Sequence, residues 1–383
     1  FAALVSSGGA PRASIFMGKK DGDSAEKTLG GCFLLQIILS AVLTVVLLIW
    51  NEELLLTFGA SENTIAYATD YMSIYALGTI FVQLTLGMNA FITAQGFTTI
   101  SMVSIIIGAV CNIILDPIFI FGFDMGVKGA ALATILSQAV SAVLVVITLL
   151  RTDTCVKLSI RKLKLHMEML KKIVRVGIPA ALQMAITSFS NIFVQSYINF
   201  FGANCMSGWT AYAKIDQLLF LPMQSIALAS TTFVGQNLGC NQVDRAKKGV
   251  QAALLIGIAS VIVMMIPIMI FAEPVVAFFN SEAAVVEYGS MFLRWLTPFY
   301  ILCCFNQVYT AALRGAGNTR APMIILISGF VVFRQVYLFI MSRICNEIIP
   351  IAMSYPAGWL VCSLVTTIYF YKVKLGKTRL VED

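Results

Sequence analysis

Apolar runs follow one another along almost the whole 383-residue chain, separated by short polar connections. Each run matches the ~20 residues that a helix needs to cross a bilayer. Hydrophobic residues make up 59% of the chain and charged residues 12%, against roughly 25% charge in a soluble domain. We therefore predict an all-α polytopic membrane protein. The expected spans are a partial one at 1–17 and complete ones at 29–49, 64–93, 100–123, 129–150, 173–200, 208–235, 249–271, 284–313, 321–343 and 350–371.

The basic residues are distributed unevenly between the two sides of this arrangement. If the spans alternate in direction, most Lys and Arg fall on one side, in the connections 18–28, 151–172, 236–248 and 314–320 and in the tail after Tyr371. The positive-inside rule places that side in the cytosol. We expect a multi-pass protein of the plasma (inner) membrane with a cytosolic carboxyl terminus. The basic clusters then reflect topology, and nucleic acid is not expected as a partner.

Three sequence landmarks occur twice, in the same order. The pairs are Phe16–Gly18 with Phe233–Gly235, Glu53–Glu62 with Glu273–Glu282, and Ala94–Thr99 with Leu313–Thr319. Six spans, an even number, separate equivalent positions, so the two halves have the same orientation. Parallel repeats of this kind occur in secondary transporters.

The repeat defines the expected domains. An amino-terminal lobe of about five helices covers 1–150, a charged cytosolic connector covers 151–172, a six-helix carboxyl-terminal lobe covers 173–371, and a cytosolic tail covers 372–383. The chain opens inside an apolar stretch with Phe1 rather than Met. We therefore expect a fragment that lacks the first helix and part of the second.

Asp116 is the residue that points most directly to function. It lies in an otherwise uncharged apolar run, where an ionised carboxylate costs at least ~2.5–3.5 kcal/mol and persists mainly beside a cavity or a partner. Asn112 lies one helical turn earlier, on the same face. Pro117 follows, and it cannot donate to the carbonyl of Ile113. An acid, an amide and a free carbonyl suit a proton or a small hard cation, so we predict a coupling-ion site.

Several segments together resemble the multidrug and toxic compound extrusion (MATE) family. They are Gly9–Gly18, Ala94–Gly96, Asn112–Pro117, Gly126–Thr134, Gly177–Pro179, Phe233–Gly239 and Leu313–Thr319. The resemblance covers nearly the whole chain. It implies two six-helix lobes around a central cleft, and export of organic cations and other amphipathic compounds in exchange for Na+ or H+.

The resemblance also implies which residues couple the ion. In one branch of the family an acid of the first helix acts with Asn and Asp in N-x-x-x-D and with a Thr of the next helix. The last three fall on Asn112, Asp116 and Thr134, with Na+ or H+ expected at Asp116 and Asn112. Another branch uses acids of the seventh and tenth helices. Here the seventh-helix position falls near Thr187, and no acid lies between Leu296 and Leu313, so the resemblance favours the amino-lobe site.

Four polar residues of the carboxyl-terminal lobe are candidates for a substrate cavity. They are Gln183, Asn191, Lys214 and Asp216. Lys214 and Asp216 are two positions apart and so do not lie on one helix face.

The sequence therefore predicts a cation-coupled antiporter that exports amphipathic, cationic compounds by alternating access. We expect a monomer in the lipid bilayer, with no cofactor besides the coupling ion. A lipid-linked oligosaccharide flippase of the same superfamily is the alternative, although its cleft is expected to carry more basic residues. An enzyme is not expected, because the chain has one histidine and no His-Glu-x-x-His motif. A channel is not expected either, because no ring of charges or filter-like loop is apparent.

Overall fold

The computed structural model describes residues 1–57, 64–152, 156–159, 163, 164, 166–373 and 375. Every regular element in these ranges is a helix. Part of the predicted connector 151–172, most of the predicted tail 372–383 and part of the landmark Glu53–Glu62 lie outside the described residues.

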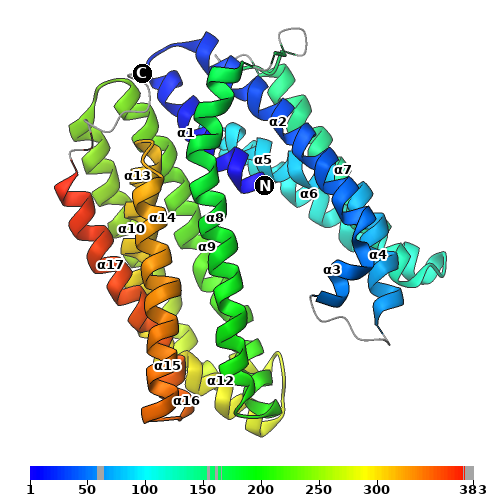
Figure 1. Ribbon diagram of the computed structural model, residues 1–383, viewed down its shortest axis with the longest axis vertical. Helices are drawn as coiled ribbons and strands as arrows, with labels where there is room; N and C mark the ends of the chain where they lie inside the picture. Colours follow the sequence, from blue (N-terminus) through cyan, green and yellow to red (C-terminus); the bar gives the residue numbers. More distant parts are fainter. Residues whose placement is uncertain (58–63, 153–155, 160–162, 165, 374, 376–383) are drawn as a thin grey trace. The chain divides into compact units, whose positions relative to one another are not determined.

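The chain divides into two compact units, Phe1–Ile178 (unit 1) and Pro179–Asp383 (unit 2). The division falls inside a helix, α8, which begins at Met167 within the predicted connector 151–172. In order along the chain (Figure 1), the helices up to this point are α1 (Ala2–Gly18), α2 (Gly22–Ile49), α3 (Asn51–Thr57), α4 (Ile65–Leu77), α5 (Thr79–Ala94), α6 (Thr98–Pro117), η1 (Ile118–Gly122), α7 (Gly126–Arg151) and α8 (Met167–Asn199). They continue as α9 (Ala203–Gly239), α10 (Val243–Ile270), α11 (Ala272–Ala277), α12 (Ala283–Leu296), η3 (Thr297–Phe299), α13 (Tyr300–Gly315), α14 (Arg320–Ile327), η4 (Ser328–Phe333), α15 (Arg334–Ile344), α16 (Ile348–Ala352) and α17 (Ser354–Lys372).

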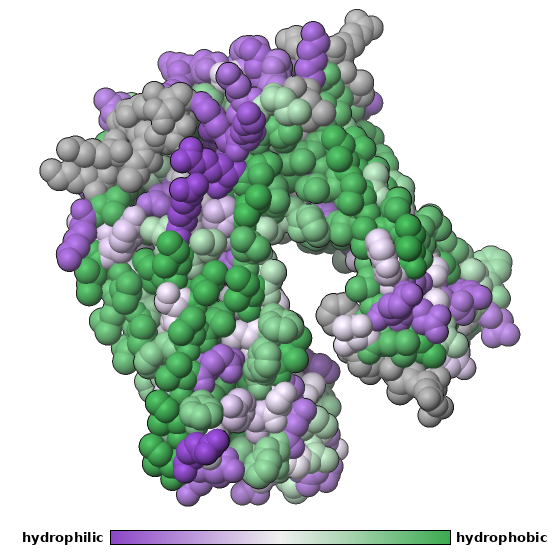
Figure 2. Space-filling model, in the orientation of Figure 1, coloured by the Kyte–Doolittle hydropathy of each residue, from purple (hydrophilic) through white to green (hydrophobic). Residues whose placement is uncertain are grey.

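The predicted complete membrane spans other than 64–93 are confirmed as long apolar helices. In the described part of the chain, nine helical segments are long and apolar enough to cross a membrane. A tenth is added if α4 and α5 count as one bent span. In unit 2, Figure 2 shows apolar side chains over the middle of the helices and hydrophilic ones toward both ends, as a bilayer requires.

The predicted span at 64–93 is bent in the structure. This segment is broken at Gly78 into α4 and α5, whose axes differ by 56°. A Cβ atom on Gly78 would lie only 2.4 Å from Ile135 of α7. The glycine therefore lets the backbone pass close to α7 at the point where the chain turns. Hydropathy averages over this break because both halves are apolar.

Each unit is held together by close helix packing. In unit 1, α1, α2 and α5 pack together, and α6 packs against α7. In unit 2, α9 packs against α10, α12 and α13, while α17 packs against α13 and η4. These contacts place the polar residues described next inside or at the edge of a helix bundle.

Candidate functional site

Asp116 and Asn112 are hydrogen-bonded to each other on α6. Asn112 Nδ2 donates to Asp116 Oδ1 over 3.3 Å, and both side chains are partly exposed. The structure therefore brings together the two residues of unit 1 that were predicted to bind the coupling ion. A carboxylate that also accepts an amide N–H keeps an oxygen available for a proton or cation.

The backbone beside Asp116 is irregular. Helix α6 ends at Pro117, and the chain continues as the π-helix η1. Pro117 has no N–H, so the carbonyl of Ile113 cannot accept its α-helical bond. The N–H of Phe123 bonds to the carbonyl of Ile118 over 2.9 Å, with the spacing of a π turn. Such turns are frequent at functional sites, and this one begins two residues after the carboxylate.

Thr134 does not join the Asn112–Asp116 pair. It lies on α7, which packs against α6, but its hydroxyl donates to the carbonyl of Ala130 over 2.9 Å. Back-bonding of this kind is common for Thr in helices. The structure therefore places Thr134 on the neighbouring helix without a hydrogen bond to the carboxylate.

Unit 2 contains a carboxylate of its own, Asp216 on α9. Its Oδ1 accepts a close hydrogen bond from Tyr300 Oη and a 3.4 Å bond from Tyr212 Oη. The two tyrosine hydroxyls lie 3.0 Å apart, and both tyrosines are buried. None of the ion pairs between described residues includes Asp216. Two neutral hydroxyls, not a basic side chain, stabilise this carboxyl group.

Lys214 lies apart from Asp216, as their spacing predicts. Its side chain is exposed, and its Nζ lies 5.6 Å from the centre of the Phe279 ring. The contact is a cation–π interaction at the surface of unit 2. Lys214 therefore contributes no group to the Asp216 cluster.

Gln183 and Asn191 each bind an arginine. Gln183 Oε1 accepts a 2.7 Å hydrogen bond from Arg314 Nη2, and Asn191 Oδ1 accepts a 2.8 Å bond from Arg334 Nη2. Both glutamine and asparagine lie on α8. Arg314, which the sequence placed in the connection 314–320, lies in the last turn of α13 and turns to α8.

Sequence analysis missed Arg334 altogether. It falls inside the predicted span 321–343, and its side chain is only 4% exposed. The signal was present, because a guanidinium in the middle of an apolar span has the same insertion cost that singled out Asp116. Tyr212 and Tyr300 gave no such signal, since tyrosine is common in membrane helices.

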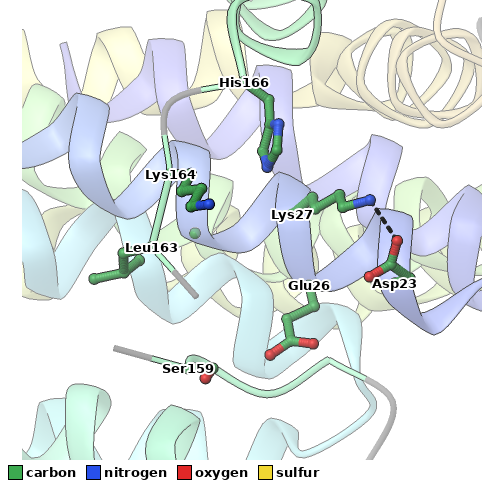
Figure 3. Close-up of a pocket in the computed structure, with 8 residues that line it drawn as sticks. Asp23, Glu26, Lys27, Ser159, Leu163, Lys164 and His166 are labelled. Carbon is green, nitrogen blue, oxygen red and sulfur yellow. Dashed lines mark ion pairs between the residues drawn. The ribbon is translucent and has the colours of Figure 1, made fainter. Parts of the chain in front are cut away.

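A separate cavity lies at the polar end of unit 1. It measures about 310 Å³ and is lined by Asp23, Glu26 and Lys27 of α2 and by Ser159, Lys164 and His166 of the segment before α8, among others. Lys27 and Asp23 form an ion pair at its edge, with 2.5 Å between Nζ and Oδ2; a dashed line marks it in Figure 3. Charged groups of both signs surround this opening. None of the residues that line it is Asp116, Asp216 or Arg334.

Ionisable side chains inside membrane spans are typical of ion and solute pathways. Both units carry them, on α6 in unit 1 and on α9, α13 and α15 in unit 2. The fold and these residues together define a multi-pass membrane protein of the transporter class.

The MatE family profile matches residues 1–118 and 179–340, and the chain belongs to this family. It is 26% identical over 378 residues to the "Probable multidrug resistance protein YoeA" of Bacillus subtilis (strain 168), covering 95% of this chain and 81% of that protein. It is 28% identical over 309 residues to the "Multidrug export protein MepA" of Staphylococcus aureus (strain bovine RF122 / ET3-1), covering 80% and 68%.

Solved structures confirm the predicted fold class. The chain matches an "outward-facing conformation of a multidrug resistance MATE family transporter of the MOP superfamily" with a TM-score of 0.90 and 25% identity, over 97% of this chain and 83% of that one. It matches a "MOP superfamily transporter from Pyrococcus furiosus Vc1 (DSM3638)" with a TM-score of 0.91 and 25% identity, over the same shares.

Proposed function

We propose that the chain is a cation-coupled antiporter that exports amphipathic organic compounds, organic cations among them, by alternating access. The coupling ion is Na+ or H+, and Asp116 with Asn112 binds it. The hydrogen bond between these two residues on α6 is the observation that carries the proposal. The names of the relatives, which describe multidrug resistance and multidrug export, support the solute class.

The proposed mechanism follows from the cost of charge inside a membrane. Ionised Asp116 gains from a bound cation or from water, and protonated Asp116 is compatible with an apolar surrounding. The carboxyl group of Asp116 can therefore alternate between a form that holds a proton or cation and a form that holds neither. Export is coupled to the ion if the ion and the solute favour different conformations, and the coupling is their difference in affinity for the two. We place the protein in the plasma membrane as a monomer, with a cytosolic carboxyl terminus.

A lipid-linked oligosaccharide flippase is the second candidate. Arg314 and Arg334 favour it, because basic groups inside the helical spans suit a pyrophosphate, whereas few charges were expected there from the sequence. The amide partners of these arginines on α8 are neutral. A lipid-linked phosphate would therefore meet guanidinium groups that no ion pair between described residues neutralises.

The test is efflux of a fluorescent lipophilic cation from proteoliposomes that contain the full-length protein. Na+ and H+ gradients are imposed separately, on the wild type and on Asp116→Asn. The matched control is Asp124→Asn, which makes the same change on an exposed residue eight positions later. Asp124 has a φ of 53°, a conformation that asparagine adopts readily, so the control should fold.

We expect gradient-driven efflux in the wild type and in Asp124→Asn, and loss of the response to the gradient in Asp116→Asn. The gradient that drives efflux identifies the ion. Equal coupling in Asp116→Asn would remove Asp116 from the mechanism. Folded wild-type protein that transports no organic cation under either gradient would contradict drug export and favour the flippase.

A further inference from the structure

Arg334 lies buried near the middle of the span Arg320–Ile344 in unit 2. It is the first residue of α15, directly after the π-helix η4, and its side chain is 4% exposed. Its Nη2 donates to Ser190 Oγ and to Asn191 Oδ1, each over 2.8 Å. Both acceptors are neutral residues of α8. The guanidinium is therefore held in one orientation at mid-span, the depth at which transporters bind their solutes.

The positive charge of Arg334 has no acidic partner among the residues that the structure describes. None of the ion pairs between described residues includes it, and the carboxylate of Asp216 is bonded to two tyrosines. The guanidinium lies 4.7 Å from the centre of the Tyr355 ring. Its Nε is buried and has no hydrogen-bond partner in the described part of the chain. A guanidinium has five N–H donors, so this one retains donors for a further acceptor.

The surrounding backbone fixes Arg334 against α17. An added Cβ on Gly329 would lie 2.2 Å from Cys362 Sγ, and one on Gly358 would lie 3.2 Å from the carbonyl oxygen of Gly329. These glycines allow η4 and α17 to approach closely. The close approach of η4 and α17 places Tyr355 of α17 against the face of the Arg334 guanidinium. Helix packing therefore fixes the position of this guanidinium.

Helix α8 contacts a second arginine, Arg314 of α13, on the same side. Gln183, which binds Arg314, precedes Ser190 by seven residues, which is two turns on one helix face. The rise between them is ~10 Å. Ser190 also accepts a 3.0 Å bond from Gln335 Nε2. One polar face of α8 thus contacts two arginines at different depths of the membrane.

Apolar side chains stand beside this polar face. Asn191 is exposed, and so are its neighbours Phe189, Ile192 and Phe193, at 60%, 56% and 50%. The Phe189 and Phe193 rings pack edge to face, 5.3 Å apart. An accessible amide at the edge of a guanidinium, next to exposed rings, fits a molecule with an acidic group and an apolar body.

We propose that Arg334, Asn191 and Ser190 form an anion-recognition site in unit 2, which binds the carboxylate, sulfonate or phosphate group of an amphipathic solute. Arginine binds such groups through paired N–H donors, and Arg314 provides a second cationic position two turns along α8. The site adds anionic and zwitterionic molecules to the solutes of the proposed antiporter. Its role in transport rests on that proposed function. The acidic group can belong to a free amphiphile or to a lipid-linked phosphate.

The test is equilibrium binding of radiolabelled decyl phosphate to the full-length protein in neutral detergent, with undecaprenyl phosphate as the lipid-linked probe. The variants are Arg334→Gln and Arg334→Lys. Arg343→Gln is the charge control, because it removes an exposed arginine from the same helix. Gln335→Ala is the packing control, because it removes a neutral contact to Ser190. Size-exclusion profiles and melting temperatures identify variants that do not fold.

We expect Arg334→Gln to weaken phosphate binding by about tenfold or more, the range for a hydrogen bond to a charged group. Arg334→Lys should weaken it less, while Arg343→Gln and Gln335→Ala should leave it within about threefold of the wild type. Binding of undecaprenyl phosphate alone, with the same loss in Arg334→Gln, would support the site and assign it to a lipid-linked ligand.

Unchanged binding in a folded Arg334→Gln or Arg334→Lys would overturn the proposal. So would an equal loss in Gln335→Ala, which would identify a structural contact between α8 and α15. Wild-type protein that binds neither phosphate would also overturn it. Gradient-driven efflux of an organic cation through Asp116 would still stand in each of these cases, so failure of this site and failure of the proposed function are distinguishable.

Discussion

Replacement of Gly78 by alanine should strain the contact between the α4–α5 bend and α7. The backbone of Gly78 has a φ of −87°, which alanine adopts without strain. The added Cβ, however, would lie 2.4, 2.7 and 2.8 Å from three carbon atoms of Ile135. Ile135 is β-branched and 8% exposed, so it has little freedom to move aside. We expect Gly78→Ala to lower the free energy of unfolding by about 1–3 kcal/mol, the usual cost of overpacking.

A second substitution tests whether this contact is the cause. Ile135→Ala alone should cost about 2–5 kcal/mol, because it leaves a cavity. In the double variant the new methyl group occupies part of that cavity, and the steric conflict is gone. The cost of the double variant should therefore fall short of the sum of the two single costs by at least ~1 kcal/mol.

The assay is unfolding of the purified protein in mixed micelles with increasing SDS, followed by circular dichroism. The melting temperature of each variant in neutral detergent provides an independent comparison. Additive costs, or a Gly78→Ala variant as stable as the wild type, would show that the bend does not approach α7 as closely as the structure indicates. Efflux should change little in Gly78→Ala if the variant remains folded, because Asn112 and Asp116 lie on another helix.

Two further contacts can be tested by substitution. Asp21 caps α2, and its Oδ1 accepts a 3.1 Å bond from the N–H of Ser24, so Asp21→Ala should cost about 1 kcal/mol near neutral pH. Hydrogen bonding to Ser24 lowers the pKa of Asp21. The stability that the cap contributes is therefore complete above the unfolded-state pKa of about 3.9 and is lost as the pH falls through the lower folded-state pKa. The stabilities of the wild type and of Asp21→Ala should converge in acid. Gly329→Ala should lower the melting temperature, because its Cβ would lie 2.2 Å from Cys362 Sγ, and Cys362→Ala should restore part of the loss.

Hydropathy predicted the helices because insertion into a membrane is a local property of the chain. Each ~20-residue run must satisfy its own backbone hydrogen bonds in lipid, whatever its neighbours are. The Asn112–Asp116 contact was also predictable, since both residues lie on one helix at a spacing of four. The break at Gly78 was not, because it depends on how closely another helix approaches.

The partners of the other polar residues depend on tertiary packing. The sequence contains Asp216 and Arg334, but nothing local indicates that the first contacts two tyrosines and the second contacts α8. Thr134 fits a family pattern, yet its hydroxyl bonds to its own helix. Insertion cost can identify a charged residue inside a span, and it would have identified Arg334. It cannot say which face of which helix that residue meets.

The π-helices η1 and η4 have a mechanical consequence. A π turn bonds residue i to residue i+5 and so holds one residue more than an α turn. If the π turn became an α turn, the helix on one side of it would rotate by ~100° and shift by ~1.5 Å relative to the helix on the other side. Arg334 directly follows η4, and Asp116 lies two residues before η1. In each unit, a change in a few backbone hydrogen bonds would thus move a charged side chain, Asp116 or Arg334, to a different set of neighbours. The rest of the helix bundle would stay folded.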